Sequence, residues 1–149
     1  MIAATPAAAC TNASPGVNWA RCTLDGQSLA GVDLTGARLR EASFGRADLS
    51  DARLVSVDGF RAKFVRAQAT GIKLTEARLQ ETDFTRATLV GADLAGADLR
   101  RARLDAADLR GASLVGARIE ATVFTNAILD GARWIDGRLC AQGSIGRCE

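Results

Sequence analysis

The side chains that could carry chemistry in this 149-residue chain are four cysteines, 19 lysines and arginines, and 17 aspartates and glutamates. Histidine is absent, which removes the commonest general base and metal ligand. Ser–His–Asp, Cys–His and histidine-containing zinc sites are therefore excluded. The formal net charge of +2 makes the chain neither polybasic nor polyacidic. The remaining candidates are the cysteines, clusters of basic side chains and paired carboxylates.

The four cysteines lie in two pairs near the ends of the sequence. Of the three connectivities that four cysteines allow, we expect the two local ones, Cys10–Cys22 and Cys140–Cys148. Each would close a short loop and contribute on the order of 2–3 kcal/mol. Because no Cys-x-x-Cys spacing occurs and the two pairs lie at opposite ends of the chain, the sequence predicts no metal site. No cofactor is predicted either. An even number of cysteines confined to the ends favours an oxidising compartment.

The first ten residues contain no basic segment and no apolar stretch of the length that a secretory leader needs. We interpret the chain as the mature form of an exported protein, periplasmic or secreted rather than cytoplasmic. Residues 7–10, Ala-Ala-Ala-Cys, also resemble a lipoprotein cleavage site, although a capping disulfide is the favoured role of Cys10. No run of about 18 apolar residues occurs, so no membrane span is predicted.

One group of basic residues stands out by its spacing. Arg46, Arg66 and Arg86 recur at intervals of twenty residues, and Lys63 and Arg103 are expected on the same side of the molecule. Stacked like charges cost stability unless something offsets them. One interpretation is therefore a site for an anion or an acidic partner. The other is that these long side chains separate in water or pair with nearby carboxylates.

A five-residue repeat must position these side chains. Every leucine falls in one frame of this repeat, together with both tryptophans and four of the five phenylalanines, and only Gly59 and Ala69 interrupt the frame between residues 19 and 139. The position two residues earlier usually holds alanine. Neither a helical period nor strict strand alternation fits this spacing. It predicts a solenoid in which each unit forms one side of a coil, with glycines suited to the corners.

The units Ala-Asp-Leu-Ala-Gly (92–96), Ala-Asp-Leu-Arg-Arg (97–101) and Ala-Asp-Leu-Arg-Gly (107–111) resemble the pentapeptide repeat family, whose consensus is Ala-(Asp/Asn)-Leu-X-X. The resemblance implies an all-β solenoid, a right-handed quadrilateral β-helix with about six coils of four units. It also implies a bacterial protein and a vertical neighbour for each residue twenty positions along the chain.

The resemblance covers residues 17–141 and divides the chain into three parts. Residues 1–16, with Cys10, are expected to form an N-terminal segment or cap, and residues 142–149, with Cys148, a C-terminal cap. Such caps are needed because the ends of a solenoid otherwise expose apolar surface and strand edges.

A coil of twenty residues predicts that side chains twenty positions apart stack about 4.8 Å from one another. An internal ladder would then contain Phe44, Phe64, Phe84 and Phe124. Charges of alternating sign recur at the same spacing in two outer rows, Arg38–Asp58–Arg78–Asp98–Arg118 and Arg21–Glu41–Arg61–Glu81–Arg101. Unlike neighbours in such rows contribute roughly 0.2–1 kcal/mol each. We interpret both rows as a solvated outer wall.

The unit that contains Gly59 and Phe60 departs from the repeat, because Gly59 removes a large inward side chain and Phe60 occupies an outward position. Two interpretations stand. The core repacks around the missing side chain with Phe60 folding over it, or Phe60 is an exposed interface aromatic among neighbouring cations.

No catalytic residue is predicted, and the protein is not expected to be an enzyme. Carboxylate pairs such as Asp48/Asp51 and Asp105/Asp108 are expected on convex outer faces, where no enclosure shifts a pKa. The leading hypothesis is a scaffold of the bacterial periplasm or exterior, a monomer or weak homodimer, that binds a protein or envelope component through flat β-walls.

Two other functions are weighed against the scaffold. The alternative is an anion-binding module. It would bind phosphate, a glycan or nucleic acid through the basic stripe, which we define as Arg46, Arg66, Arg86, Lys63 and Arg103. A third possibility comes from the resemblance, because some pentapeptide repeat proteins mimic duplex DNA and protect a topoisomerase. That role depends on an acidic rod, and the net charge of +2 departs from it, so nucleic-acid-related partners are not favoured.

Overall fold

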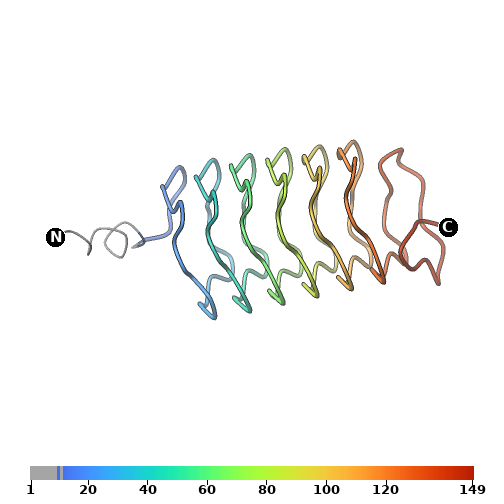
Figure 1. The fold of residues 1–149 in the computed structure, drawn as a ribbon, viewed down its shortest axis with the longest axis horizontal. Coiled ribbons are helices and arrows are strands. Elements are labelled where there is room, and N and C mark those ends of the chain that lie inside the picture. Colours follow the sequence, from blue (N-terminus) through green and yellow to red (C-terminus); the bar gives the residue numbers. More distant parts are fainter. Residues whose placement is uncertain (1–9, 11) are drawn as a thin grey trace.

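The computed structural model describes Cys10 and residues 12–149, which wind into an elongated rod with the two ends of this segment far apart (Figure 1). Parallel backbone bridges join each residue of one row to the residue twenty positions later, from Asn18↔Arg38 to Ser113↔Arg133. Each bridge is a single residue long, and the described residues contain no α-helix and no longer strand. One coil therefore takes twenty residues and has four sides, as the family resemblance implies.

Each five-residue unit repeats one pattern of backbone hydrogen bonds, which residues 62–66 illustrate. The N–H of Lys63 donates to the carbonyl of Ala42 in the preceding coil (2.9 Å), and the N–H of Phe64 donates to the carbonyl of Asp83 in the following coil (2.7 Å). The N–H of Ala67 donates to the carbonyl of Phe64 (3.0 Å) and closes the turn at the corner. This pattern fixes which side chains point inward.

The fifth residue of each unit occupies the corner in a left-handed conformation. Gly71 has a φ of 72° there, and Arg66 has a φ of 58°. Glycine adopts this conformation without steric cost, whereas arginine does not. The N–H of Arg66 nevertheless donates to the carbonyl of Thr85 in the next coil (2.9 Å), so the ladder holds the corner in place. Arginines can therefore project from corners, and Arg46, Arg66 and Arg86 of the basic stripe do so.

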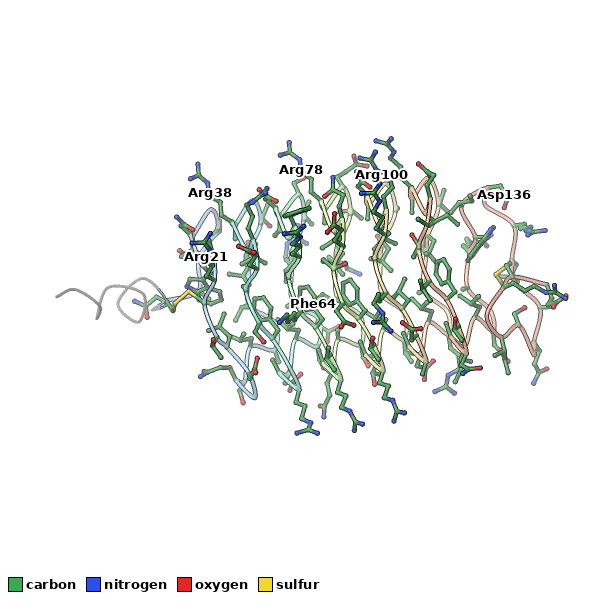
Figure 2. The ribbon with its side chains drawn as sticks, viewed as in Figure 1. Arg21, Arg38, Phe64, Arg78, Arg100 and Asp136 are labelled. Carbon is green, nitrogen blue, oxygen red and sulfur yellow. A yellow bond between two sulfur atoms is a disulfide. The ribbon has the colours of Figure 1, made fainter. Side chains whose placement is uncertain are left out.

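The first and third residues of each unit fill the interior. The rings of Phe44 and Phe64 stack with centroids 5.0 Å apart, and those of Phe64 and Phe84 stack at 4.7 Å. Both pairs have planes within 6° of parallel, and Figure 2 shows Phe64 inside the rod. Phe124 is half-buried and contacts Trp134 with a centroid distance of 5.3 Å. The interior is thus a column of stacked aromatic and aliphatic side chains.

We call the side that contains this stack the phenylalanine side. It consists of residues 62–66 and the units at twenty-residue intervals from them, namely 22–26, 42–46, 82–86, 102–106 and 122–126.

In the unit that contains Gly59 and Phe60, a side chain of the next coil fills the interior space beside Gly59. A Cβ on Gly59 would lie 3.0 Å from Cδ2 of Leu79, so Leu79 takes up the space that a larger residue at 59 would need. Val57 and Ile72 are fully buried in the same region. Phe60 stays on the outer surface, half-buried, with the guanidinium groups of Arg40 and Arg61 lying 4.7 and 4.9 Å from its ring centroid. Its role as an interface aromatic stays a prediction.

Disulfides close both ends of the rod, with the expected connectivity (Figure 2). The Cα atoms of Cys10 and Cys22 are 5.8 Å apart, next to the buried Trp19. Those of Cys140 and Cys148 are 4.9 Å apart. The expected N-terminal segment, including the sequence that resembles a cleavage site, lies largely outside the described residues.

The C-terminal tail folds back across the last coil. The last parallel bridge ends at Arg133, before the expected boundary at residue 141, and antiparallel bridges then join Ile128 to Ile145 and Arg133 to Leu139. The N–H of Leu129 donates to the carbonyl of Ser144 (2.8 Å), so the tail supplies an acceptor where another coil would have done so. This closure protects part of the terminal edge.

The expectation that the inward frame continues to Leu139 is wrong. Leu139 keeps the five-residue spacing but is 60% exposed. The chain reverses direction at Gly137, whose φ is 88°, and the hairpin that follows turns Leu139 away from the core.

Candidate functional site

An open depression of about 640 Å³ lies on the phenylalanine side. Three cationic residues of the predicted stripe line it, namely Arg46, Lys63 and Arg66. Its other lining residues are Asp25, Gly26, Ser43, Gly45 and Val65. The twenty-residue coil is what brings them together, because Arg46 and Arg66 occupy the same corner of successive coils.

The three cations of this depression have no ion-pair partner among the described residues. Arg46, Lys63 and Arg66 are all exposed, and none forms a salt bridge in this part of the chain. The opposite corner of the same side differs. There Arg61 pairs with Glu81 (3.0 Å), and Arg21 pairs with Glu41 (3.1 Å). On this side of the rod, the unpaired positive charge therefore lies at one corner and beside it. Within the described part of the chain, Arg53, Lys73 and Arg78 are unpaired cations on other sides.

The structure does not gather the whole predicted stripe at this depression. Arg86 continues the corner but does not line it. Arg103 donates to Asp105 (3.0 Å), so its charge is already paired. Lys63 and Arg103 also line a second depression of about 660 Å³, which contains the paired Glu81. Two of the five predicted residues are thus separated from the site that the other three form.

The aspartates of the repeat have a role that the sequence analysis missed. The N–H of the fourth residue of each unit is not used by the backbone ladder of the coils. An aspartate at the second position accepts a hydrogen bond from it, as Asp83 Oδ1 does from the N–H of Thr85 (2.9 Å) and Asp48 Oδ1 from that of Ser50 (3.0 Å). An aspartate bonding to the backbone two residues later is a known turn signal, so the Ala-Asp-Leu spacing contained the information.

On the phenylalanine side this acceptor changes from coil to coil. The N–H of Gly45 donates to Asp25 Oδ1 of the preceding coil (2.9 Å), and Asp25 also accepts from the hydroxyl of Ser43. The next unit has Lys63 at the second position, and the N–H of Val65 has no acceptor among the described residues. Val65, whose N–H has no acceptor among the described residues, thus lines the depression beside three cations.

One of the two alternating charge rows differs from expectation. Arg118 lies 3.9 Å from Asp98, as a vertical pair should, but Asp58 pairs with Arg40 (3.1 Å) and Asp98 pairs more closely with Arg100 (2.6 Å). The reason is the capping hydrogen bond. Because Asp98 Oδ1 accepts from the N–H of Arg100, the carboxylate also faces that residue's guanidinium. Arg38 and Arg78 point away from the rod into solvent (Figure 2).

These capping contacts predict a loss of stability in acid. Side-chain hydrogen bonds from Arg100 and Arg110 are the main reason that the pKa values of Asp98 and Asp108 are lowered. A carboxyl whose pKa is lower in the folded state stabilises the protein above its unfolded pKa, and this contribution disappears as the pH falls through the folded pKa. We expect a decline that begins below about pH 4 and amounts to about 0.5–1 kcal/mol per carboxylate, since solvent screens both pairs.

Denaturant unfolding at pH 6 and pH 3 measures this decline. Asp108→Asn should reduce the difference in the free energy of unfolding between pH 6 and pH 3. The matched change Glu76→Gln, at an exposed position, should reduce that difference less. Equal pH dependence in the two variants would contradict the assignment.

A third depression, of about 530 Å³, lies where Phe60 meets the neighbouring charged row. Glu81, Arg100 and Glu120 are among its lining residues. Within the described segment no group of three acidic or cysteine side chains is placed to hold a metal ion, and no helix is long and apolar enough to cross a membrane.

The coil geometry and the disulfide-closed ends define the class of this protein as a solenoid of five-residue units. The model of a family described as pentapeptide repeats matches residues 20–55, 62–101 and 102–133, in eight copies. The chain belongs to the pentapeptide repeat family, and its fold is a right-handed quadrilateral β-helix. The one gap between the matched ranges, residues 56–61, contains Gly59 and Phe60. Proteins of this family are generally structural or interaction modules.

Solved structures of the family resemble this chain. A pentapeptide repeat protein, Rfr23, from the cyanobacterium Cyanothece 51142 is 26% identical, with 70% of this chain and 82% of that chain covered and a TM-score of 0.53. QnrB1, a plasmid-mediated fluoroquinolone resistance protein, is 26% identical over 74% of this chain and 59% of its own, with a TM-score of 0.43.

A third solved relative is a pentapeptide repeat protein of the Arabidopsis thaliana thylakoid lumen. It is 26% identical over 74% of this chain and 70% of its own, with a TM-score of 0.31. A comparison with curated protein sequences finds no match.

Proposed function

We propose that the protein is a non-enzymatic interaction scaffold of an oxidising compartment, the bacterial periplasm or exterior, and that it binds a protein or envelope partner through its walls. One observation carries this proposal. Both ends of the rod are closed by disulfides while stacked apolar side chains fill its interior, so the outer walls are the surface left for recognition. Disulfides of this kind persist where thiols are not kept reduced.

The charge on the walls supports protein recognition over duplex mimicry. A rod that imitates DNA has to present negative charge along its length, whereas this chain carries a net charge of +2 and pairs acidic with basic side chains on successive coils. Membership of the pentapeptide repeat family makes a topoisomerase-protecting role the competing function to test. A protein with that role acts on a cytoplasmic enzyme, and in the cytoplasm the two disulfides would be reduced.

A wall-specific photocross-linking experiment tests the proposal. A photoreactive amino acid is placed at position 60, beside Arg40 and Arg61, and at the exposed position 70 on the opposite side of the coil. We expect a discrete adduct from one wall only, formed in the envelope fraction by protein without free thiols. Identical adducts from both positions, or an active pool with four free thiols in the cytoplasm, would refute the scaffold assignment.

A further inference from the structure

The phenylalanine side presents three unpaired cations together with a backbone donor. Arg46, Lys63 and Arg66 line one depression, and none of them has an ion-pair partner among the described residues. Stacking Arg46 over Arg66 at the spacing of adjacent strands is unfavourable unless an anion offsets the repulsion. At the opposite corner of the same side, the protein itself offsets the repulsion between cations, because Glu81 lies between Arg61 and Arg101.

The backbone indicates where an anion would sit. In the coil above, Asp83 supplies a carboxylate oxygen to the N–H of Thr85, and in the coil below, Asp25 supplies one to the N–H of Gly45. Between them, Lys63 replaces the aspartate, so the N–H of Val65 has no such oxygen in the described structure. The N–H groups of Val55, Thr75 and Gln80 also lack one there, each two residues after a basic side chain, but only Val65 of these lies in the depression lined by Arg46 and Arg66. An external oxygen at that position would accept from Val65 and lie beside the ammonium group of Lys63.

We propose that this depression binds a tetrahedral oxyanion, the phosphate or sulfate group of a ligand outside the rod. One oxygen takes the position that a carboxylate oxygen occupies in the adjacent coils, and Arg46 and Arg66 donate to the others from the corner. Charge-assisted hydrogen bonds of this kind are the stronger ones in proteins, and arginine matches the geometry of phosphate. The proposal does not depend on the scaffold function.

Asp25 makes the site testable by a change of opposite sign. Its carboxylate lines the same depression and repels an anion, although two of its hydrogen bonds go to Ser43 and Gly45. Asp25→Asn removes the charge and keeps an oxygen for the N–H of Gly45. This variant should bind the oxyanion several times more tightly than the native protein.

The experiment is a titration of the full chain with inorganic phosphate, and separately with sulfate, at constant ionic strength, followed by amide chemical shifts. We expect saturable shifts centred on Val65 and Arg66. Arg66→Gln and Lys63→Gln should each weaken binding about tenfold, since each removes one charged contact. Arg66→Lys should restore only part of the affinity. The matched control Arg78→Gln makes the same charge change on another side and should leave the affinity unchanged.

Two further probes separate the sources of the group. Glycerol phosphate represents a phosphate ester, and a short heparin fragment represents a sulfated glycan. Each is added in competition with inorganic phosphate, and the probe that displaces it at the lower concentration identifies the kind of ligand that carries the oxyanion. An equal loss of binding in Arg78→Gln and Arg66→Gln would show only a general charge effect and overturn the site. Unchanged affinity in Asp25→Asn, or shifts that do not saturate, would do so too.

Discussion

Replacing Phe64 by alanine is expected to lower the free energy of unfolding by about 3–5 kcal/mol. The ring of Phe64 is fully buried and stacks on both Phe44 and Phe84. Its removal loses apolar burial and two ring contacts and leaves a cavity that the rigid ladders on all four sides cannot close. Denaturant unfolding followed by circular dichroism measures the change.

Two variants control this result. Phe64→Leu should cost less than about 1.5 kcal/mol, because an aliphatic side chain of similar shape already fills the equivalent interior position at Leu104. Phe124→Ala should also cost less than Phe64→Ala, since Phe124 is only half-buried. A loss at position 64 no greater than that at 124 would mean that the ring is not in the middle of a stack.

Reducing the two disulfides is expected to have the second-largest effect, about 2–3 kcal/mol for each bridge. The bridge between Cys10 and Cys22 ties Cys10 to the first coil beside the buried Trp19, and that between Cys140 and Cys148 fixes the tail that covers the last coil. Freeing either segment exposes the apolar end of the column and the edge of the ladder.

Unfolding midpoints with and without a reductant measure this effect. The double variant Cys140→Ser with Cys148→Ser isolates the C-terminal bridge and should lose about half of the total. Cys22, Cys140 and Cys148 are buried, so a mild reductant should act slowly until denaturant opens the ends. An unchanged midpoint after complete reduction would contradict the capping role.

Most of the fold could be predicted from the sequence, because the five-residue repeat indicates a solenoid and the family resemblance implies a coil with four sides. A five-residue frame of large and small inward residues leaves few solutions, and the recurrence of phenylalanine at twenty residues matches the four-sided coil in which Phe44, Phe64 and Phe84 stack. The cysteine pairing followed from the same logic, since only local pairs close the ends of a rod.

The details that escaped prediction depend on hydrogen bonds within single units and on the reversal of the chain at the C-terminal end. Charge spacing alone pairs Asp98 with Arg78 and Arg118, but the capping bond to the N–H of Arg100 turns the carboxylate toward Arg100. In the unit of Phe64, Lys63 stands where other units have a capping aspartate, so the N–H of Val65 has no acceptor among the described residues. Leu139 kept its spacing but left the core, because the chain reverses at Gly137.

The most direct test of the account is a measurement of proton–proton contacts between aromatic rings in solution, with each phenylalanine assigned by substitution. The twenty-residue coil predicts contacts of Phe64 with both Phe44 and Phe84, and of Phe124 with Trp134. If Phe64 shows contacts to neither Phe44 nor Phe84, residues twenty apart are not vertical neighbours. The cationic depression would then have no structural basis.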